Sequence, residues 1–125
     1  MAAPNLGASS LTITGITNYY TLSSTAATVV CTNAASSGKL LKVHTVMVAN
    51  DDGTDDATII LSINSAAAGG GTAYKLAHTI TVPADSTLIL IDENSPINLE
   101  EDRSLVATAS AANDLDVVVS YLDIS

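Results

Sequence analysis

The stretch from Leu40 to Ile63, "LLKVHTVMVANDDGTDDATIILSI", decides the fold of this chain. Its two apolar runs, 40–49 and 57–64, are rich in β-branched residues and are short enough to be β-strands. The acidic stretch 50–56, "NDDGTDD", separates them. Asparagine and aspartate side chains bond their own backbone in turns, and Gly53 can supply a positive φ. We therefore predict two strands joined by a hairpin loop with a solvated acidic end.

The alternative for the acidic stretch is a metal site whose oxygen ligands come from Asp51, Asp52, Asp55 or Asp56. A calcium EF-hand loop needs a glycine at its sixth position and a bidentate glutamate at its twelfth. Counted from Asn50, the twelfth residue is Leu61, inside a predicted strand. This spacing excludes an EF-hand, and a looser, weak metal site at 51–56 stays open beside the loop interpretation.

The composition limits the size and the chemistry of the core. The chain has 125 residues, no Phe, no Trp and four Tyr. One domain is expected at this length, with a core built from Val, Ile, Leu and Ala. Aromatic side chains bury the largest areas, so this core is thin, and burial against other copies or another protein is expected to add stability.

The charge balance excludes two classes of partner. Lys and Arg total 4 against 13 Asp and Glu, which gives a formal net charge of −9. A nucleic-acid-binding protein needs basic residues that neutralise phosphates, and an anionic membrane needs the same sign. We therefore expect neither nucleic acid nor membrane as a partner.

The strand signature recurs along the whole chain. Apolar runs alternate with Gly, Asn, Asp, Ser and Pro, and the turn signals come every 8 to 12 residues or so. The fold class is therefore all-β, a single antiparallel β-sandwich or jelly-roll-like domain of about eight strands over 11–125. Residues 1–10 are small and polar, and we predict a flexible, extended N-terminal arm. The remaining strands are predicted at 11–16, 26–32, 74–82, 86–92, 104–109 and 115–123.

Alternation within the runs assigns side chains to faces. In 57–64 one face carries Ala57, Ile59, Leu61 and Ile63. In 74–82 one face carries Tyr74, Leu76, Ile80 and Val82, and the other carries Lys75, Ala77, Thr79 and Thr81. The run "TLILI" is apolar on both sides, so its strand is expected to be central or covered by a partner. The last strand is also apolar on both sides from Val117 to Val119, which indicates a contact between subunits.

The search for catalytic chemistry finds no site. Cys31 is the only cysteine, has no activating base nearby, and is interpreted as a small buried hydrophobe. His44 and His78 belong to no zinc-binding motif. The adjacent carboxylates of 100–102 lie in one turn rather than across a cleft, and Gly69–Gly71 lacks a phosphate-binding motif. We expect no enzyme activity, no cofactor and no metal centre.

The N-terminal segment "MAAPNLGASS" has no basic start and no apolar stretch of the secretory type. No run approaches the roughly 20 apolar residues of a membrane-spanning helix. We therefore expect a soluble protein that is made in a cytoplasm.

Four segments from Val46 onward carry a resemblance to a known family: "VANDDG", "YKLAHTITVPADSTLIL", "PINLEEDRSLVATAS" and "LDVVVSYLDI". The last two-thirds of the chain resembles small β-sandwich virion structural proteins of tailed bacteriophages, of the capsid decoration (cement) type. That family often has Gly-Asp after its Leu-Glu-Glu turn, whereas this chain has 101–103, "EDR", which predicts a different turn geometry. The residues that match are Tyr74, Leu76, Val82, Pro83, Ala84, Leu99, Glu100, Ser120, Tyr121 and Leu122.

The resemblance implies a non-enzymatic structural protein of the virion, made in the host cytoplasm. A capsid decoration protein binds the outer capsid lattice and stabilises it. The implied partners are further copies of the chain, with a trimer expected, and the major capsid protein or other virion proteins. The alternatives are a neck, tail or fibre-base component and, from another class, a sugar- or calcium-binding module. Only Tyr19 and Tyr20 could offer a sugar an exposed aromatic ring.

The predicted interface has two parts, the N-terminal arm and the last strand. An arm that reaches onto a neighbour adds avidity in a lattice. The interface residues are predicted to be Met1, Ala2, Ala3, Pro4, Asn5, Leu6, Val117, Val118 and Val119.

Overall fold

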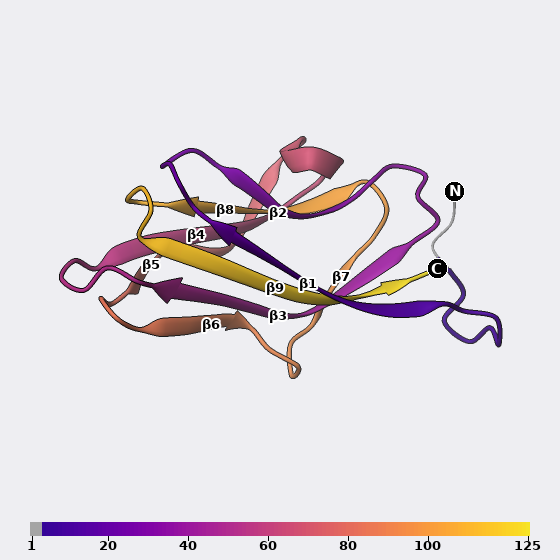
Figure 1. Cartoon of the computed structure of the whole chain (residues 1–125). Helices are drawn as coiled ribbons and strands as arrows, with labels where there is room; N and C mark the ends of the chain where they lie inside the picture. Colours follow the sequence, from indigo (N-terminus) through magenta and orange to yellow (C-terminus); the bar gives the residue numbers. More distant parts are fainter. Residues whose placement is uncertain (1–3) are drawn as a thin grey trace.

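The computed structural model describes residues 4–125 and consists of strands and one short 3-10 helix in that range. Two antiparallel sheets stack face to face (Figure 1). The elements are β1 (Ile13–Thr21), β2 (Thr28–Asn33), β3 (Leu40–Asn50), β4 (Ala57–Asn64), η1 (Ala67–Gly69), β5 (Ala73–Val82), β6 (Thr87–Ile91), β7 (Ile97–Leu99), β8 (Arg103–Ala109) and β9 (Leu115–Ile124).

The strand order is that of a jelly roll. Sheet A has the order β1-β9-β3-β6, with β7 also paired to β3, and sheet B has the order β2-β8-β4-β5. The predicted all-β sandwich is therefore confirmed. Each predicted strand overlaps an observed one, but β1 continues to Thr21, beyond the predicted end at residue 16, and the three-residue strand β7 was missed.

The predicted hairpin at 51–56 is wrong. β3 lies in sheet A and β4 in sheet B, so this loop crosses from one sheet to the other. β3 already pairs with β9 on one side and with β6 and β7 on the other, which leaves no edge for β4. Gly53 does not have a positive φ either. The turn is instead held by Asp52, whose Oδ1 accepts hydrogen bonds from the backbone N–H of Thr54 (2.8 Å) and Asp55 (3.2 Å).

The core between the sheets is aliphatic, as the composition predicted. The largest fully buried side chains are Leu and Val with one Ile, and the tyrosines that touch the core, Tyr20 and Tyr121, are only partly buried. Cys31 is 3% exposed, and burial raises the pKa of its thiol to about 12. The thiol therefore stays protonated at neutral pH and packs as a small hydrophobe.

The face assignment is right for β4 from Ala57 to Leu61, but not at its end, where Ser62 is buried and Ile63 only partly so, and it is wrong for β5. Ala57, Ile59 and Leu61 are buried in the core, but on β5 the inward residue opposite Leu61 is Ala77, not Leu76. The β4–β5 register shifts twice, and Thr79 has a positive φ of 49°. These β-bulges break the period-two alternation, so Leu76, which was assigned to the same face as the buried Val82, is 42% exposed.

Candidate assembly interface

An apolar row crosses the outer face of sheet A. Its residues come from four adjacent strands and lie opposite one another in register: Tyr19 on β1, Val118 on β9, Met47 on β3 and Ile89 on β6. Tyr19 is 74% exposed and Ile89 is 58% exposed. Neighbouring strands lie about 4.8 Å apart, so this apolar row runs about 14 Å across the sheet.

Backbone alternation explains how the apolar row forms. The neighbours of Val118 along β9 and of Met47 along β3 are fully buried valines, so both side chains must point outward. The next rows on either side are polar: Thr17 donates or accepts a hydrogen bond with Ser120 (2.9 Å), and Thr21 donates one to Asp116 (2.7 Å). An apolar strip with a polar border is the usual anatomy of a contact surface.

The interface residues predicted from the sequence have different locations. Val117 and Val119 are 0% exposed and pack inside the core, whereas Val118 lies at the centre of the apolar row. Of the arm, Met1, Ala2 and Ala3 lie outside the described residues.

The described part of the arm is 4–10, which includes Pro4, Asn5 and Leu6. Leu6 is 57% exposed, and the backbone N–H of Ala8 donates to the carbonyl of Asn5 (3.0 Å). Two residues after the arm, Thr12 and Ser125 exchange two backbone hydrogen bonds of 2.8 and 2.9 Å, which tie the chain there to the C-terminal end of β9.

The sequence alone missed Tyr19, Met47 and Ile89 as interface candidates. "TLILI" was expected to be central or covered by a partner; the first alternative is wrong because β6 is an edge strand of sheet A, and the second stays a prediction. Its Leu88 and Leu90 pack partly against the core, while Ile89 is left on the surface.

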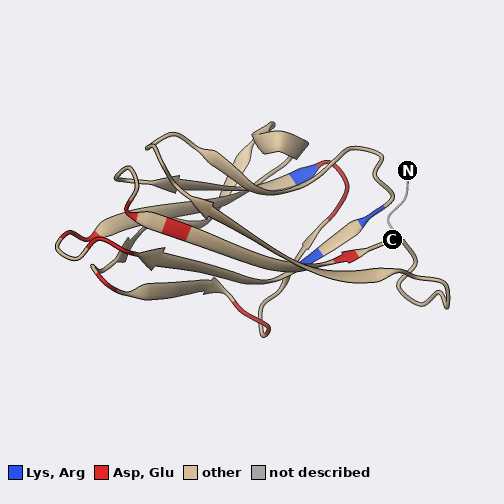
Figure 2. Cartoon of the chain, viewed as in Figure 1, with Lys and Arg blue, Asp and Glu red and all other residues tan. Residues whose placement is uncertain are grey.

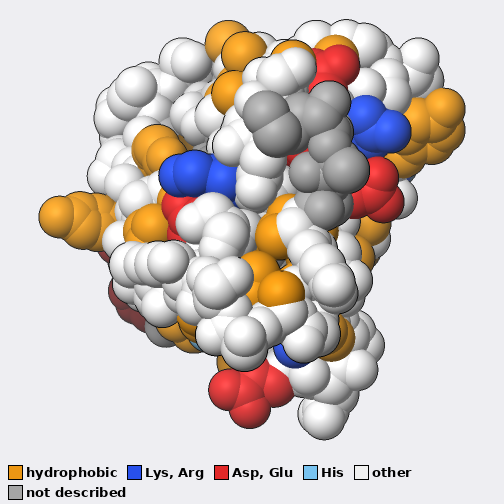
Figure 3. Space-filling model, turned by 90° about the vertical axis from the view of Figure 1, so that its right-hand side faces the viewer, with side chains coloured by type: hydrophobic (Ala, Val, Ile, Leu, Met, Phe, Trp, Pro, Cys, Tyr) orange, Lys and Arg blue, Asp and Glu red, His pale blue; other side chains and the backbone are white. Residues whose placement is uncertain are grey.

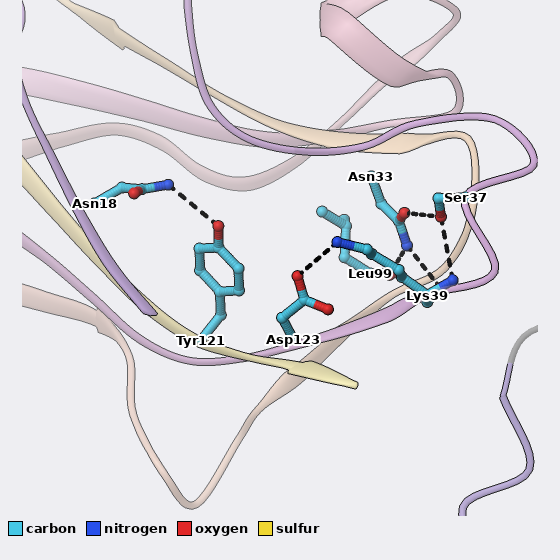
Figure 4. A network of polar contacts seen from close by, with 7 residues as sticks. All are labelled: Asn18, Asn33, Ser37, Lys39, Leu99, Tyr121 and Asp123. Carbon is cyan, nitrogen blue, oxygen red and sulfur yellow. Dashed lines mark hydrogen bonds and ion pairs between the residues drawn. The ribbon is translucent and has the colours of Figure 1, made fainter. Parts of the chain in front are cut away.

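A polar network holds the loop between β2 and β3 at one end of the sandwich (Figure 4). Asn33 is 2% exposed, and its Nδ2 donates to the carbonyls of Lys39 (2.9 Å) and Leu99 (2.9 Å), while its Oδ1 accepts from Ser37. The Lys39 ammonium pairs with Asp123 at 3.0 Å. The network satisfies backbone groups that sheet pairing leaves open, so it is structural. Figure 3 shows that basic, acidic and apolar side chains mix on this end.

The opposite end of the sandwich is acidic. Figure 2 shows acidic residues gathered in the loops at the left end, where β3 runs into β4 and β8 into β9, with no Lys or Arg among them. Desolvation raises the pKa of Asp114, and the nearby carboxylates of Asp52, Asp55 and Asp51 raise it further. Asp85 and Asp56 belong to the same end: the Asp85 N–H donates to the Asp52 carbonyl, and Asp56 accepts from the backbone of the β5–β6 turn.

Two carboxyl groups of this acidic end should titrate on opposite sides of the ordinary aspartate range. The backbone N–H of Thr54, then that of Asp55, holds the pKa of Asp52 low, whereas the pKa of Asp114 is raised. The stabilisation from ionised Asp52 is present above its ordinary pKa and is lost as the pH falls through its lowered value. We expect NMR titration of carboxyl carbons to place Asp52 below Asp114, and Asp52→Ala to lower the pKa of Asp114. The reverse order would contradict these hydrogen bonds.

Among residues 4–125, no group of three or more His, Cys, Asp or Glu side chains is arranged to hold a metal ion. His44 lies beside Thr45 on β3, with its Nδ1 3.0 Å from the Thr45 hydroxyl, and His78 is exposed on β5. Glu100, Glu101 and Asp102 follow one another in the turn before β8, and Oδ1 of Asp102 accepts from the N–H of Ala67 (3.0 Å). These side chains serve turns and strand surfaces. The described part of the chain has no helix long and apolar enough to cross a bilayer.

The similarity of this chain to known proteins lies in its three-dimensional fold rather than in its sequence. No family model matches it, and no curated protein is similar to it at a significant level. Among solved structures, a pilus protein from the work "Bacillus endospore appendages form a novel family of disulfide-linked pili" has 15% identity and a TM-score of 0.51 over 98% of this chain and 95% of that one.

Two viral structures are also similar. A protein chain from the crystal structure of the T13 IBDV viral particle has 11% sequence identity with this chain and a TM-score of 0.50, and the match covers 98% of this chain and 35% of that one. The capsid asymmetric unit of cyanophage Pam1 has 16% identity and a TM-score of 0.35, which is too low to support an argument. At these identities the first two matches show a shared β-sandwich fold and leave function open.

Proposed function

We propose that the chain is a non-enzymatic structural protein of a tailed-phage virion, a capsid decoration protein that binds the outer capsid lattice as a homo-oligomer, with a trimer as the expected state. The observation that carries this proposal is the apolar row on the outer face of sheet A. Ile89 is 58% exposed and lies in a row with Tyr19, Val118 and Met47. A partner that covers this row would bury apolar surface, which stabilises the complex.

Three further observations support the proposal. The fold is one that a viral particle protein also has, and the resemblance over the last two-thirds of the chain is to decoration proteins. The acidic end suits a surface that faces away from DNA, since phosphates would repel it.

The mechanism is burial rather than chemistry. The apolar row would lie against the capsid surface or a neighbouring copy, and the arm, residues 1–10, would reach onto an adjacent subunit. Thr12, two residues after the arm, is hydrogen-bonded to Ser125, so the arm can leave the sandwich without breaking a strand.

Co-sedimentation with capsids purified without this chain tests the proposal. Wild type should bind, and Ile89→Asp should bind about tenfold more weakly or worse, because a carboxylate would be buried in an apolar contact. Ile80→Asp is the matched control: Ile80 is also an exposed isoleucine, but it lies on sheet B, and its replacement should leave binding unchanged.

Removing residues 1–10 should weaken binding and leave the fold intact. Wild-type protein that never co-sediments would overturn the proposal.

A further inference from the structure

The free edge of β1 offers unpaired backbone groups. Just before β1, Thr12 and Ser125 form a reciprocal hydrogen-bonded pair, and just after it the Leu22 N–H donates to the carbonyl of Leu115 (2.9 Å). Because paired groups alternate along an antiparallel strand, the even-numbered residues of β1 direct their N–H and C=O groups to β9. The odd-numbered residues direct theirs to the open edge, and no described residue pairs with that edge. These residues are Ile13, Gly15, Thr17, Tyr19 and Thr21.

β1 lacks the protection that another edge strand of comparable length has. Natural edge strands avoid unwanted pairing through charges, prolines, bulges, short length or a covering loop. β5, an edge of sheet B, carries Lys75 and two register shifts. β1, in contrast, is nine residues long, "ITGITNYYT", with no charge, no proline and an unbroken register against β9.

The remaining edges are covered or short. On β2, the Thr32 hydroxyl accepts a hydrogen bond from the N–H of Ala68 in η1 (2.9 Å), and its register is shifted between Val29 and Cys31. β6 has only five residues and β7 only three. Of the five edge strands that the structure describes, β1 is therefore the one best suited to accept another strand.

We propose that β1 pairs antiparallel with β1 of a second copy of this chain. The chain has a net charge of −9, and β1 is a surface where two copies can approach without bringing carboxylates together along the strand. The strand is also self-complementary. When Ile16 lies opposite Ile16 of the second copy, Ile13 lies opposite Tyr19 of that copy, and the same pair forms again by symmetry.

The orientation of the backbone agrees with this register. The register places odd-numbered residues of one copy opposite odd-numbered residues of the other, and these are the residues whose N–H and C=O groups are unpaired. Ile13 is 59% exposed and Tyr19 is 74% exposed, and a β-branched residue opposite an aromatic one is a stabilising cross-strand pair. The paired sheet would extend the apolar row past Tyr19 onto Ile13 of the second copy.

This contact is isologous, with a two-fold axis through Ile16. It therefore does not close a trimer, and in a trimeric protein it would join trimers in pairs. The inference does not rest on a virion role, because it follows from the edge alone. Capsid binding and self-pairing have separate readouts, so either proposal can fail without the other.

A charge-exchange cycle tests the register, with the mass in solution measured by light scattering after size exclusion. Wild type should have twice the mass of the unpaired species, so that it is either two chains or two trimers. Ile13→Lys and Tyr19→Glu should each weaken association about tenfold or more, since each places an unpaired charge opposite an apolar side chain. The double variant should restore it, because the introduced lysine then faces the introduced glutamate of the second copy. Both sites are on the surface, so the variants should fold.

Two results would overturn the inference. One is a wild-type mass that stays at a single 12.7 kDa chain, or at a single trimer, up to about millimolar concentration, which would leave the edge to a different chain. The other is association that both single variants leave unchanged, or that the double variant fails to restore.

Discussion

Replacing Asn50 with alanine should lower the free energy of unfolding by about 2 to 4 kcal/mol, because one buried and one partly buried carbonyl group would lose their donor. Asn50 ends β3 and is 2% exposed. Its Nδ2 donates to the carbonyls of Asp55 (3.0 Å) and Val82 (2.9 Å), and its Oδ1 accepts from the N–H of Asp52 (3.0 Å). One side chain thus joins the sheet A strand, the crossing loop and the end of β5.

The matched control for Asn50→Ala is Asn98→Ala. Asn98 is also a strand asparagine, but it is exposed on β7, and its replacement should change the free energy of unfolding by less than about 0.5 kcal/mol. Urea unfolding followed by circular dichroism measures both variants. Equal, small losses would show that the Asn50 side chain does not hold the crossing loop.

The second large effect is expected from Leu61→Ala, which should cost about 3 to 4 kcal/mol. Leu61 lies on β4, a central strand of sheet B, and is 0% exposed. The core contains no phenylalanine or tryptophan, so a removed leucine leaves a cavity lined by small aliphatic side chains that cannot easily fill it.

Leu76→Ala distinguishes the observed faces of β5 from the faces that regular alternation predicts. Leu76 is 42% exposed, so its removal should cost less than about 1 kcal/mol. Alternation without bulges would place Leu76 in the core and Ala77 outside. Chemical denaturation of both leucine variants measures the difference, and a loss at Leu76 comparable to that at Leu61 would contradict the bulged register.

Strand positions follow from the sequence because the signal is local. β-branched runs bounded by turn residues mark β4 at 57–64 without any knowledge of its partners. The partner of a strand is not local. The stretch 51–56 has the turn chemistry of a hairpin, yet the same side-chain-to-backbone bonds serve equally well in a loop that crosses between sheets.

The apolar row could not be predicted for the same reason. Tyr19, Met47 and Ile89 are far apart in sequence, and only the register of three strand pairs brings them beside Val118. Alternation within β9 predicts that one side of 117–119 faces outward, but it does not say which side. The prediction of an interface on this strand therefore included the core residues Val117 and Val119 along with the surface residue.

The measurement that tests the virion role most directly is the number of copies of this chain in purified phage particles, from quantitative mass spectrometry with the major capsid protein as internal reference. A decoration protein should be present at on the order of hundreds of copies, in a fixed ratio to the capsid protein. A count of about a dozen would fit the ring symmetry of a neck or tail component instead. Particles that lack the chain would contradict a structural role in the virion.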